Sequence, residues 1–133
     1  MVAKTNGHKI LVVEDNIRLA EIMAVLLKEA GYETCLAETS AQGISKAVTE
    51  RPNFILTDLE LPDMIATEAI AILKKTPVTS HIPVVVLNAE GDHQWRTKAL
   101  KAGAAEYLLK PISPRELIKV ARKFCRRRSP TEL

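Results

Sequence analysis

The sequence has no long hydrophobic stretch, no dense set of cysteines and no strong excess of charge. No apolar run in the 133 residues approaches the roughly 20 that a membrane-spanning helix needs. Two cysteines, Cys35 and Cys125, are too few for a disulfide framework, so we expect a cytoplasmic protein in a reducing compartment. A net charge of +3 is too small to indicate a nucleic-acid partner by itself. These absences argue against a membrane protein, a secreted disulfide-rich protein and a strongly basic nucleic-acid binder.

What remains has an ordinary globular composition. Hydrophobic residues make up 47% of the chain and charged residues 26%, which is enough apolar material for one core. The first residues are basic but are not followed by an apolar segment of the signal-peptide type. We expect a flexible segment over residues 1–8, a single domain over 9–127 and a short tail over 128–133.

Five short apolar runs alternate with five segments of helical periodicity. The predicted strands span residues 9–13, 32–37, 53–57, 82–87 and 106–109. The predicted helices run from 17 to 30, from 39 or 40 to 50, from 64 to 75, from 91 or 92 to 101 and from 114 to about 127. Such alternation predicts an α/β fold with helices on both faces of a parallel sheet. With five strands, the doubly wound, flavodoxin-like order 2-1-3-4-5 fits best.

Acidic residues follow two of these strands. The first strand runs into Glu14 and Asp15, and the third runs into Asp58. In the order 2-1-3-4-5 these strands are neighbours, so three carboxylates should meet at one edge of the sheet. Like charges at close range raise one another's pKa, and a bound Mg²⁺ would relieve the repulsion. Lys110, after the fifth strand, would bring a positive charge to the same edge.

A carboxylate nucleophile, a divalent cation and a lysine are the parts needed to accept a phosphoryl group as an aspartyl phosphate. The plainer alternative is an acid-lined loop end whose charges only cap helices. Two acidic strand ends together with Lys110 favour the phosphoryl-accepting site.

Three motifs in order give the chain a resemblance to the receiver domain of bacterial two-component response regulators, from about Lys9 to Lys123. The motifs are Val13-Glu14-Asp15-Asn16, Asp58-Leu59-Glu60-Leu61-Pro62 and Tyr107-Leu108-Leu109-Lys110-Pro111. The resemblance implies that Asp58 takes a phosphoryl group from a sensor histidine kinase or a phosphotransfer protein.

The resemblance also implies roles for the neighbouring residues. Asp15, Asp58 and the main-chain carbonyl of Glu60 would bind Mg²⁺, and Glu14 would hold a magnesium-bound water. Lys110 would pair with the phosphoryl group.

The sequence departs from the family at two places. Asn88 stands where the family usually has Ser or Thr, whose hydroxyl contacts the phosphoryl group and works with an aromatic residue, here Tyr107, as a switch. An amide can also donate to phosphate, but its length and geometry differ. After Pro62 the chain has Met64-Ile65-Ala66 in place of Met-Asp-Gly, so this turn should be held differently.

These observations predict a phosphorylation-controlled binding switch rather than an enzyme with its own substrate. Its downstream protein partner would bind the face formed by helix 91–101, strand 106–109 and helix 114–127. A homodimer is also expected to be possible, through ion pairs between Glu106 and the basic residues Arg96, Lys98, Lys119 and Arg122. We expect no DNA-binding domain after residue 133, so output would run through protein contacts, unless the receiver belongs to a larger protein. The positive charges of the basic stretch 122–128 are expected to interact with the negative carboxyl end of their own helix rather than to bind nucleic acid.

Two other functions remain open. Asn88 is compatible with a phosphate-independent receiver-like module that binds its partner constitutively. An aspartyl phosphohydrolase using Asp58 and Glu60 is disfavoured, because glutamate replaces the second aspartate and no cap domain is present.

Overall fold

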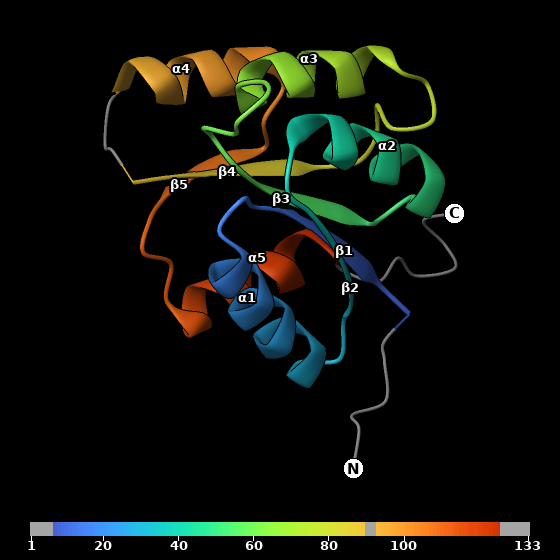
Figure 1. Cartoon of the computed structure of the whole chain (residues 1–133), viewed down its shortest axis with the longest axis vertical. Helices are drawn as coiled ribbons and strands as arrows, with labels where there is room; N and C mark the ends of the chain where they lie inside the picture. The colour runs from blue at the N-terminus through green and yellow to red at the C-terminus, as the bar shows by residue number, and fades with distance from the viewer. Residues whose placement is uncertain (1–6, 90–92, 126–133) are drawn as a thin grey trace.

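The five apolar runs form one parallel sheet. The computed structural model describes residues 7–89 and 93–125. The strands are β1 (Lys9–Val13), β2 (Glu33–Ala37), β3 (Phe54–Asp58), β4 (Val84–Asn88) and β5 (Glu106–Leu109). They lie in the order β2-β1-β3-β4-β5, all parallel (Figure 1). The predicted fold class and strand order are therefore confirmed.

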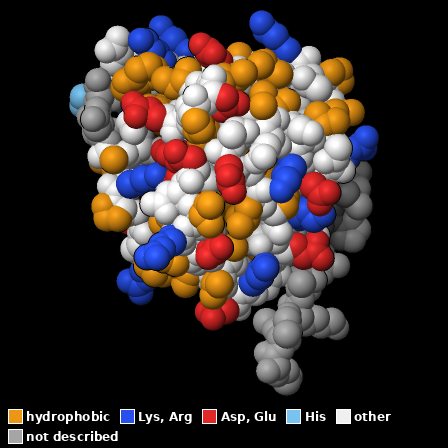
Figure 2. All heavy atoms as spheres, in the orientation of Figure 1, with side chains coloured by type: hydrophobic (Ala, Val, Ile, Leu, Met, Phe, Trp, Pro, Cys, Tyr) orange, Lys and Arg blue, Asp and Glu red, His pale blue; other side chains and the backbone are white. Residues whose placement is uncertain are grey.

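Helices cover both faces of the sheet. As Figure 1 shows, α1 (Ile17–Glu29) and α5 (Pro114–Phe124) lie on one face, and α2 (Ser40–Glu50), α3 (Ala66–Lys75) and α4 (His93–Ala102) lie on the other. No helix within the described ranges is long and apolar enough to span a membrane. Figure 2 shows hydrophobic and charged side chains interspersed over one side of the molecule, in keeping with the small net charge.

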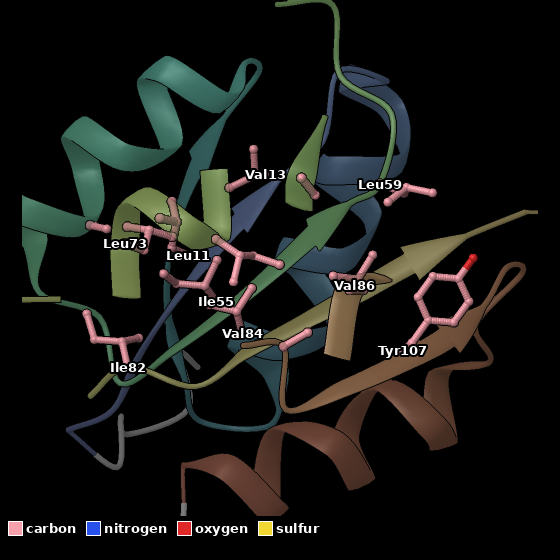
Figure 3. Packing of buried hydrophobic residues seen from close by; sticks show 14 of the residues in the cluster. Leu11, Val13, Ile55, Leu59, Leu73, Ile82, Val84, Val86 and Tyr107 are labelled. Carbon is pink, nitrogen blue, oxygen red and sulfur yellow. The ribbon is translucent and has the colours of Figure 1, made fainter. Parts of the chain in front are cut away.

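The alternation of side chains along each strand divides the core into two clusters. Leu11 and Val13 of β1 point to the side of α2 and α3, where they pack with Ile55 of β3 (Figure 3). Ile10 and Val12 point to the opposite side, that of α1 and α5. Because both faces are covered, every β1 residue from Ile10 to Val13 is buried. The sheet is therefore a rigid platform whose carboxyl edge carries the polar residues.

Side-chain caps fix the starts of three helices. Asn16 Oδ1 accepts from the amide of Leu19 at 3.1 Å. Thr39 Oγ1 accepts from Gln42 at 3.1 Å, and Ser113 Oγ accepts from Glu116 at 3.1 Å. Each of these side chains satisfies an amide that has no partner inside its own helix.

Several predicted boundaries were wrong by two or three residues. Helix α3 begins at Ala66 rather than Met64, because the preceding loop is bound to α2 by hydrogen bonds described below. Strand β4 runs from Val84 to Asn88 rather than from residue 82, since Pro83 has no amide to donate to a ladder. Helix α5 ends at Phe124, short of the predicted 127. Residues 91 and 92, proposed as the start of α4, and Arg126 to Arg128 of the basic stretch lie outside the described ranges.

Candidate functional site

The ends of β1 and β3 bring the predicted acids together. Val13 of β1 pairs with Thr57 of β3, so the residues that follow each of them emerge at the same edge of the sheet. Carboxylate oxygens of Glu14, Asp15 and Asp58 all lie within 4.8 Å of one another. Glu14 is buried, Asp58 is half-buried and Asp15 is exposed. The cluster thus has a buried floor and an open side toward solvent.

Lys110 connects β5 to this cluster. Its amide donates to the carbonyl of Asn88 at 2.8 Å, which continues the β4–β5 ladder one residue beyond β5. Its Nζ lies 2.7 Å from Glu14 Oε1 and 3.3 Å from Asp58 Oδ1. One lysine is therefore the counter-ion of two of the three acids.

Burial and charge shift the pKa values in this cluster. Burial raises the pKa of Asp58 above its usual value, although Lys110 opposes the shift. Burial likewise raises the pKa of Glu14, against the hydrogen bonds from Lys110 and from the amide of Asn16. Burial alone would lower the pKa of Lys110, but its contacts with Glu14 and Asp58 outweigh that effect and raise it. An additional positive charge at this edge would stabilise the ionised acids.

The donor set fits Mg²⁺. All three candidate ligands are carboxylates, which is the oxygen chemistry that hard divalent cations prefer, and the exposure of Asp15 leaves room for water ligands. Glu60, whose main-chain carbonyl was predicted as a further ligand, lies two residues after Asp58 in the loop that follows β3, and its side chain is exposed. Glu14 is held by Lys110, in keeping with a role through water rather than as a direct ligand.

Asn88 and Tyr107 form a direct contact across the β4–β5 pair. Asn88 Nδ2 donates to the Tyr107 hydroxyl at 2.7 Å. Both side chains are buried, with Tyr107 only 5% exposed, and the tyrosine ring packs in the core cluster (Figure 3). The structure thus joins the two residues predicted as a switch.

Sequence reasoning missed Asp63. Its two carboxylate oxygens accept from the amides of Ser40 and Ala41, both at 2.9 Å. Asp63 therefore caps α2, a helix that begins 23 residues before it in the chain. Capping signals are read from residues next to a helix in sequence, so this long-range cap had no local signature.

Glu106 has an intramolecular partner. Lys123 Nζ lies 2.6 Å from Glu106 Oε1, so an ion pair within the chain competes with the predicted contacts between two copies. Trp95 of α4 is half-buried against the core, and Lys98 Nζ lies 4.7 Å from its ring centroid. Partial packing therefore accounts for Trp95 within the described residues.

The chain is similar in sequence to curated transcriptional regulatory proteins. The chain is 38% identical over 124 residues to the phosphate regulon transcriptional regulatory protein PhoB of Pseudomonas aeruginosa, covering 93% of this chain and 54% of that protein. It is 31% identical over 128 residues to the transcriptional regulatory protein ResD of Bacillus subtilis, covering 96% and 52%. The chain thus spans about half the length of these curated relatives.

Solved structures agree in fold. The chemotaxis response regulator CheY4 of Vibrio cholerae superposes with a TM-score of 0.82 at 26% identity, covering 88% of this chain and 98% of that one. The receiver domain of the sensor histidine kinase PA1611 of Pseudomonas aeruginosa, which has a magnesium ion in its active site cleft, gives 0.81 at 28% identity, covering 89% and 97%. The family model of the response regulator receiver domain matches residues 10–122. This chain, with its acid cluster and lysine at the edge of a five-stranded parallel sheet, therefore belongs to the response regulator receiver domain family.

Proposed function

We propose that the chain accepts a phosphoryl group on Asp58, with Mg²⁺ as cofactor, from a sensor histidine kinase or a phosphotransfer protein. The observation that carries this proposal is the convergence of Glu14, Asp15 and Asp58 within 4.8 Å, with Lys110 in contact with two of them. Membership in the receiver family and the magnesium ion in the related PA1611 domain support it.

The proposed chemistry assigns a task to each side chain. An Asp58 carboxylate oxygen forms a bond to phosphorus while the bond from phosphorus to the donor atom breaks. Mg²⁺, when bound by Asp15, Asp58 and the Glu60 carbonyl, would neutralise charge on the phosphoryl oxygens. Lys110 already lies 3.3 Å from Asp58 Oδ1, so a small displacement from Glu14 would let it pair with the new phosphoryl group.

Glu14 would keep the metal-bound water oriented. Burial strengthens the contacts of Lys110 with Glu14 and Asp58 because the local dielectric is low. The exposed Glu60 side chain adds negative charge to the loop that follows Asp58. We therefore expect a strong requirement for a divalent cation and slow reaction with small anionic phosphodonors.

The output side of the proposal is a protein-binding face. We propose that α4, β5 and α5 form it, that the unit spans residues 9–127 and that it works in the cytoplasm without a substrate of its own. The relatives are transcriptional regulators, and one is named a DNA-binding response regulator. We propose that the partner of this face is a protein, and the absence of nucleic-acid binding stays a prediction.

One observation favours a second candidate, a phosphate-independent binding module. The Asn88–Tyr107 hydrogen bond of 2.7 Å already holds the tyrosine ring inside the core in the chain without phosphate. In this candidate the output face would keep one form in both states.

Intact mass spectrometry with parallel Trp95 fluorescence tests both candidates. The chain is incubated with Mg²⁺ and acetyl phosphate, beside Asp58→Asn and Asn88→Thr. A phosphoryl adduct that Asp58→Asn abolishes, with a fluorescence change, supports the switch. An adduct with no fluorescence change in the native chain, but with one in Asn88→Thr, supports the constitutive face. No adduct from acetyl phosphate or from a histidine kinase would refute the phosphoacceptor role, and sustained turnover of a generic phosphate ester would indicate the phosphohydrolase instead.

A further inference from the structure

We propose that Asp63 is a positioning residue for the metal and phosphoryl site, because it binds the loop after Asp58 to the first turn of α2. This role rests on the proposed function, since the site it serves is the one formed by Asp58 and its neighbours. Asp63 does not belong to the acid cluster that would hold the metal. It acts through the backbone of the loop formed by residues 59–65.

Three hydrogen bonds join this loop to α2. Asp63 Oδ1 accepts from the amide of Ser40 and Asp63 Oδ2 from that of Ala41, each at 2.9 Å. The Ser40 hydroxyl donates in return to the carbonyl of Met64 at 2.7 Å. Ser40 is 2% exposed, so water competes little for its contact with Met64. Loop and helix are thus connected in both directions.

The charge of Asp63 suits this position. The first turn of α2 has no acidic residue, and its own cap, Thr39, serves the amide of Gln42 only. Asp63 therefore supplies the negative charge that favours a helix amino terminus, and it satisfies two amides that Thr39 does not reach. Hydrogen bonds from Ala41 and Ser40 lower the pKa of Asp63, against a smaller opposing effect of burial, so it is ionised at neutral pH.

Helix α2 is itself seated closely on the first strand. At Gly43 a Cβ would lie 2.9 Å from Val13 Cγ2, so only glycine allows this approach of α2 to β1. Val13 directly precedes Glu14 and Asp15. Helix α2 therefore contacts the strand end that carries two of the acids and, through Asp63, the loop that follows the third. It is a common support for both halves of the site.

The loop of residues 59–65 is held at its two ends by backbone hydrogen bonds. Leu59 is fixed at both backbone groups: its amide donates to Leu87 at 2.9 Å and its carbonyl accepts from Ala66 at 2.8 Å. Between these anchors the chain bends at residues 62–64, and Ile65 is extended with no side-chain cap for α3. Asp63 therefore fixes the segment in which the Glu60 carbonyl must keep its direction to bind a metal.

Metal affinity of the whole chain tests the proposal. Free Mn²⁺ is followed by electron paramagnetic resonance, with Mg²⁺ as competitor, at a temperature well below unfolding. We expect Asp63→Ala to weaken binding about tenfold, as loss of an outer support of a metal site usually does. Asp63→Asn keeps one acceptor and should fall between Asp63→Ala and the native chain. Glu68→Ala is the matched control, since Glu68 is an exposed acid of α3 whose side chain makes no hydrogen bond or ion pair within the described residues. It should change the affinity less than twofold.

Amide hydrogen exchange of the metal-free chain gives a second readout. Exchange of the Ser40 and Ala41 amides should accelerate in Asp63→Ala and remain native in Glu68→Ala. Suppose that Asp63→Ala is folded and binds Mn²⁺ as tightly as Glu68→Ala, while Asp58→Asn no longer binds Mn²⁺. That result would overturn the positioning role of Asp63 and leave the proposed metal site standing. If Asp58→Asn and Asp15→Asn bind Mn²⁺ like the native chain, the proposed site fails instead. Should Asp63→Ala not fold, the comparison of Asp63→Asn with Glu68→Gln decides in the same way.

Discussion

Replacing Lys110 by alanine should destabilise the metal-free protein far more than its position at an open edge suggests. The Glu14 side chain is 4% exposed and that of Lys110 20%, with 2.7 Å between the charged atoms. Removing one member of a buried pair costs about 3–5 kcal/mol, because the other charge is left without a partner. Glu14 keeps the amide of Asn16 at 3.1 Å, so we expect a loss of about 2–3 kcal/mol in the free energy of unfolding.

Urea unfolding in chelator, followed by circular dichroism, measures this loss. Lys123→Ala is the matched control: its pair with Glu106 is even shorter, at 2.6 Å, but the two side chains are 59% and 30% exposed. An exposed pair of this kind contributes about 0–1 kcal/mol. In a double-mutant cycle, Glu14→Gln should recover part of the loss, because it removes the charge that Lys110→Ala leaves unpaired.

Mg²⁺ should then rescue Lys110→Ala. A ligand at 100 times its dissociation constant adds about 2.7 kcal/mol of stability. The variant should bind the cation more tightly than the native chain, since a competing positive charge is gone, and so gain more. Two results would show that Lys110 is not the counter-ion of the acid cluster. One is that Lys110→Ala in chelator is no less stable than Lys123→Ala. The other is that Mg²⁺ stabilises Lys110→Ala and the native chain equally.

Three further outcomes are expected. Asp58→Asn should raise the urea midpoint at pH 7 without metal, because the raised pKa of Asp58 in the folded chain means that its ionised form destabilises the fold. This gain should disappear as the pH falls, since Asp58 is then protonated in both the folded and the unfolded native chain. Gly103→Ala should cost about 1–2 kcal/mol in the same assay, since φ is +119° and the new Cβ would lie 2.9 Å from Lys74 Cγ; a smaller loss would show that the backbone can relax. Burial raises the pKa of Cys125 to about 12, so mass spectrometry after treatment with iodoacetamide at pH 8 should show modification of the half-buried Cys35 only; rapid modification of Cys125 would mean that α5 opens.

The order of elements could be predicted from the sequence because it depends on local rules. Apolar runs of four to six residues define the strands, and caps such as Asn16 and Ser113 define helix starts, all within a few residues of chain. Once alternation implied a parallel sheet, the neighbourhood of Glu14 and Asp58 followed from strand order alone. The family resemblance supplied the expected roles of Asp58 and Lys110, and the fold and family are confirmed.

Tertiary structure decided which side chains touch. Lys110 and Glu14 are 96 residues apart, Asn88 and Tyr107 are 19 apart, and their contacts depend on strand register and on rotamers set by packing. The sequence predicted a phosphate contact for Lys110, whereas in the metal-free chain its partners are acids. The cap of α2 by Asp63 was likewise invisible, because an aspartate after a proline reads as an ordinary turn residue until the fold brings the start of α2 to it. Sequence periodicity determines which face of an element is buried, but the distance between two polar atoms is determined only when the elements that carry them have packed.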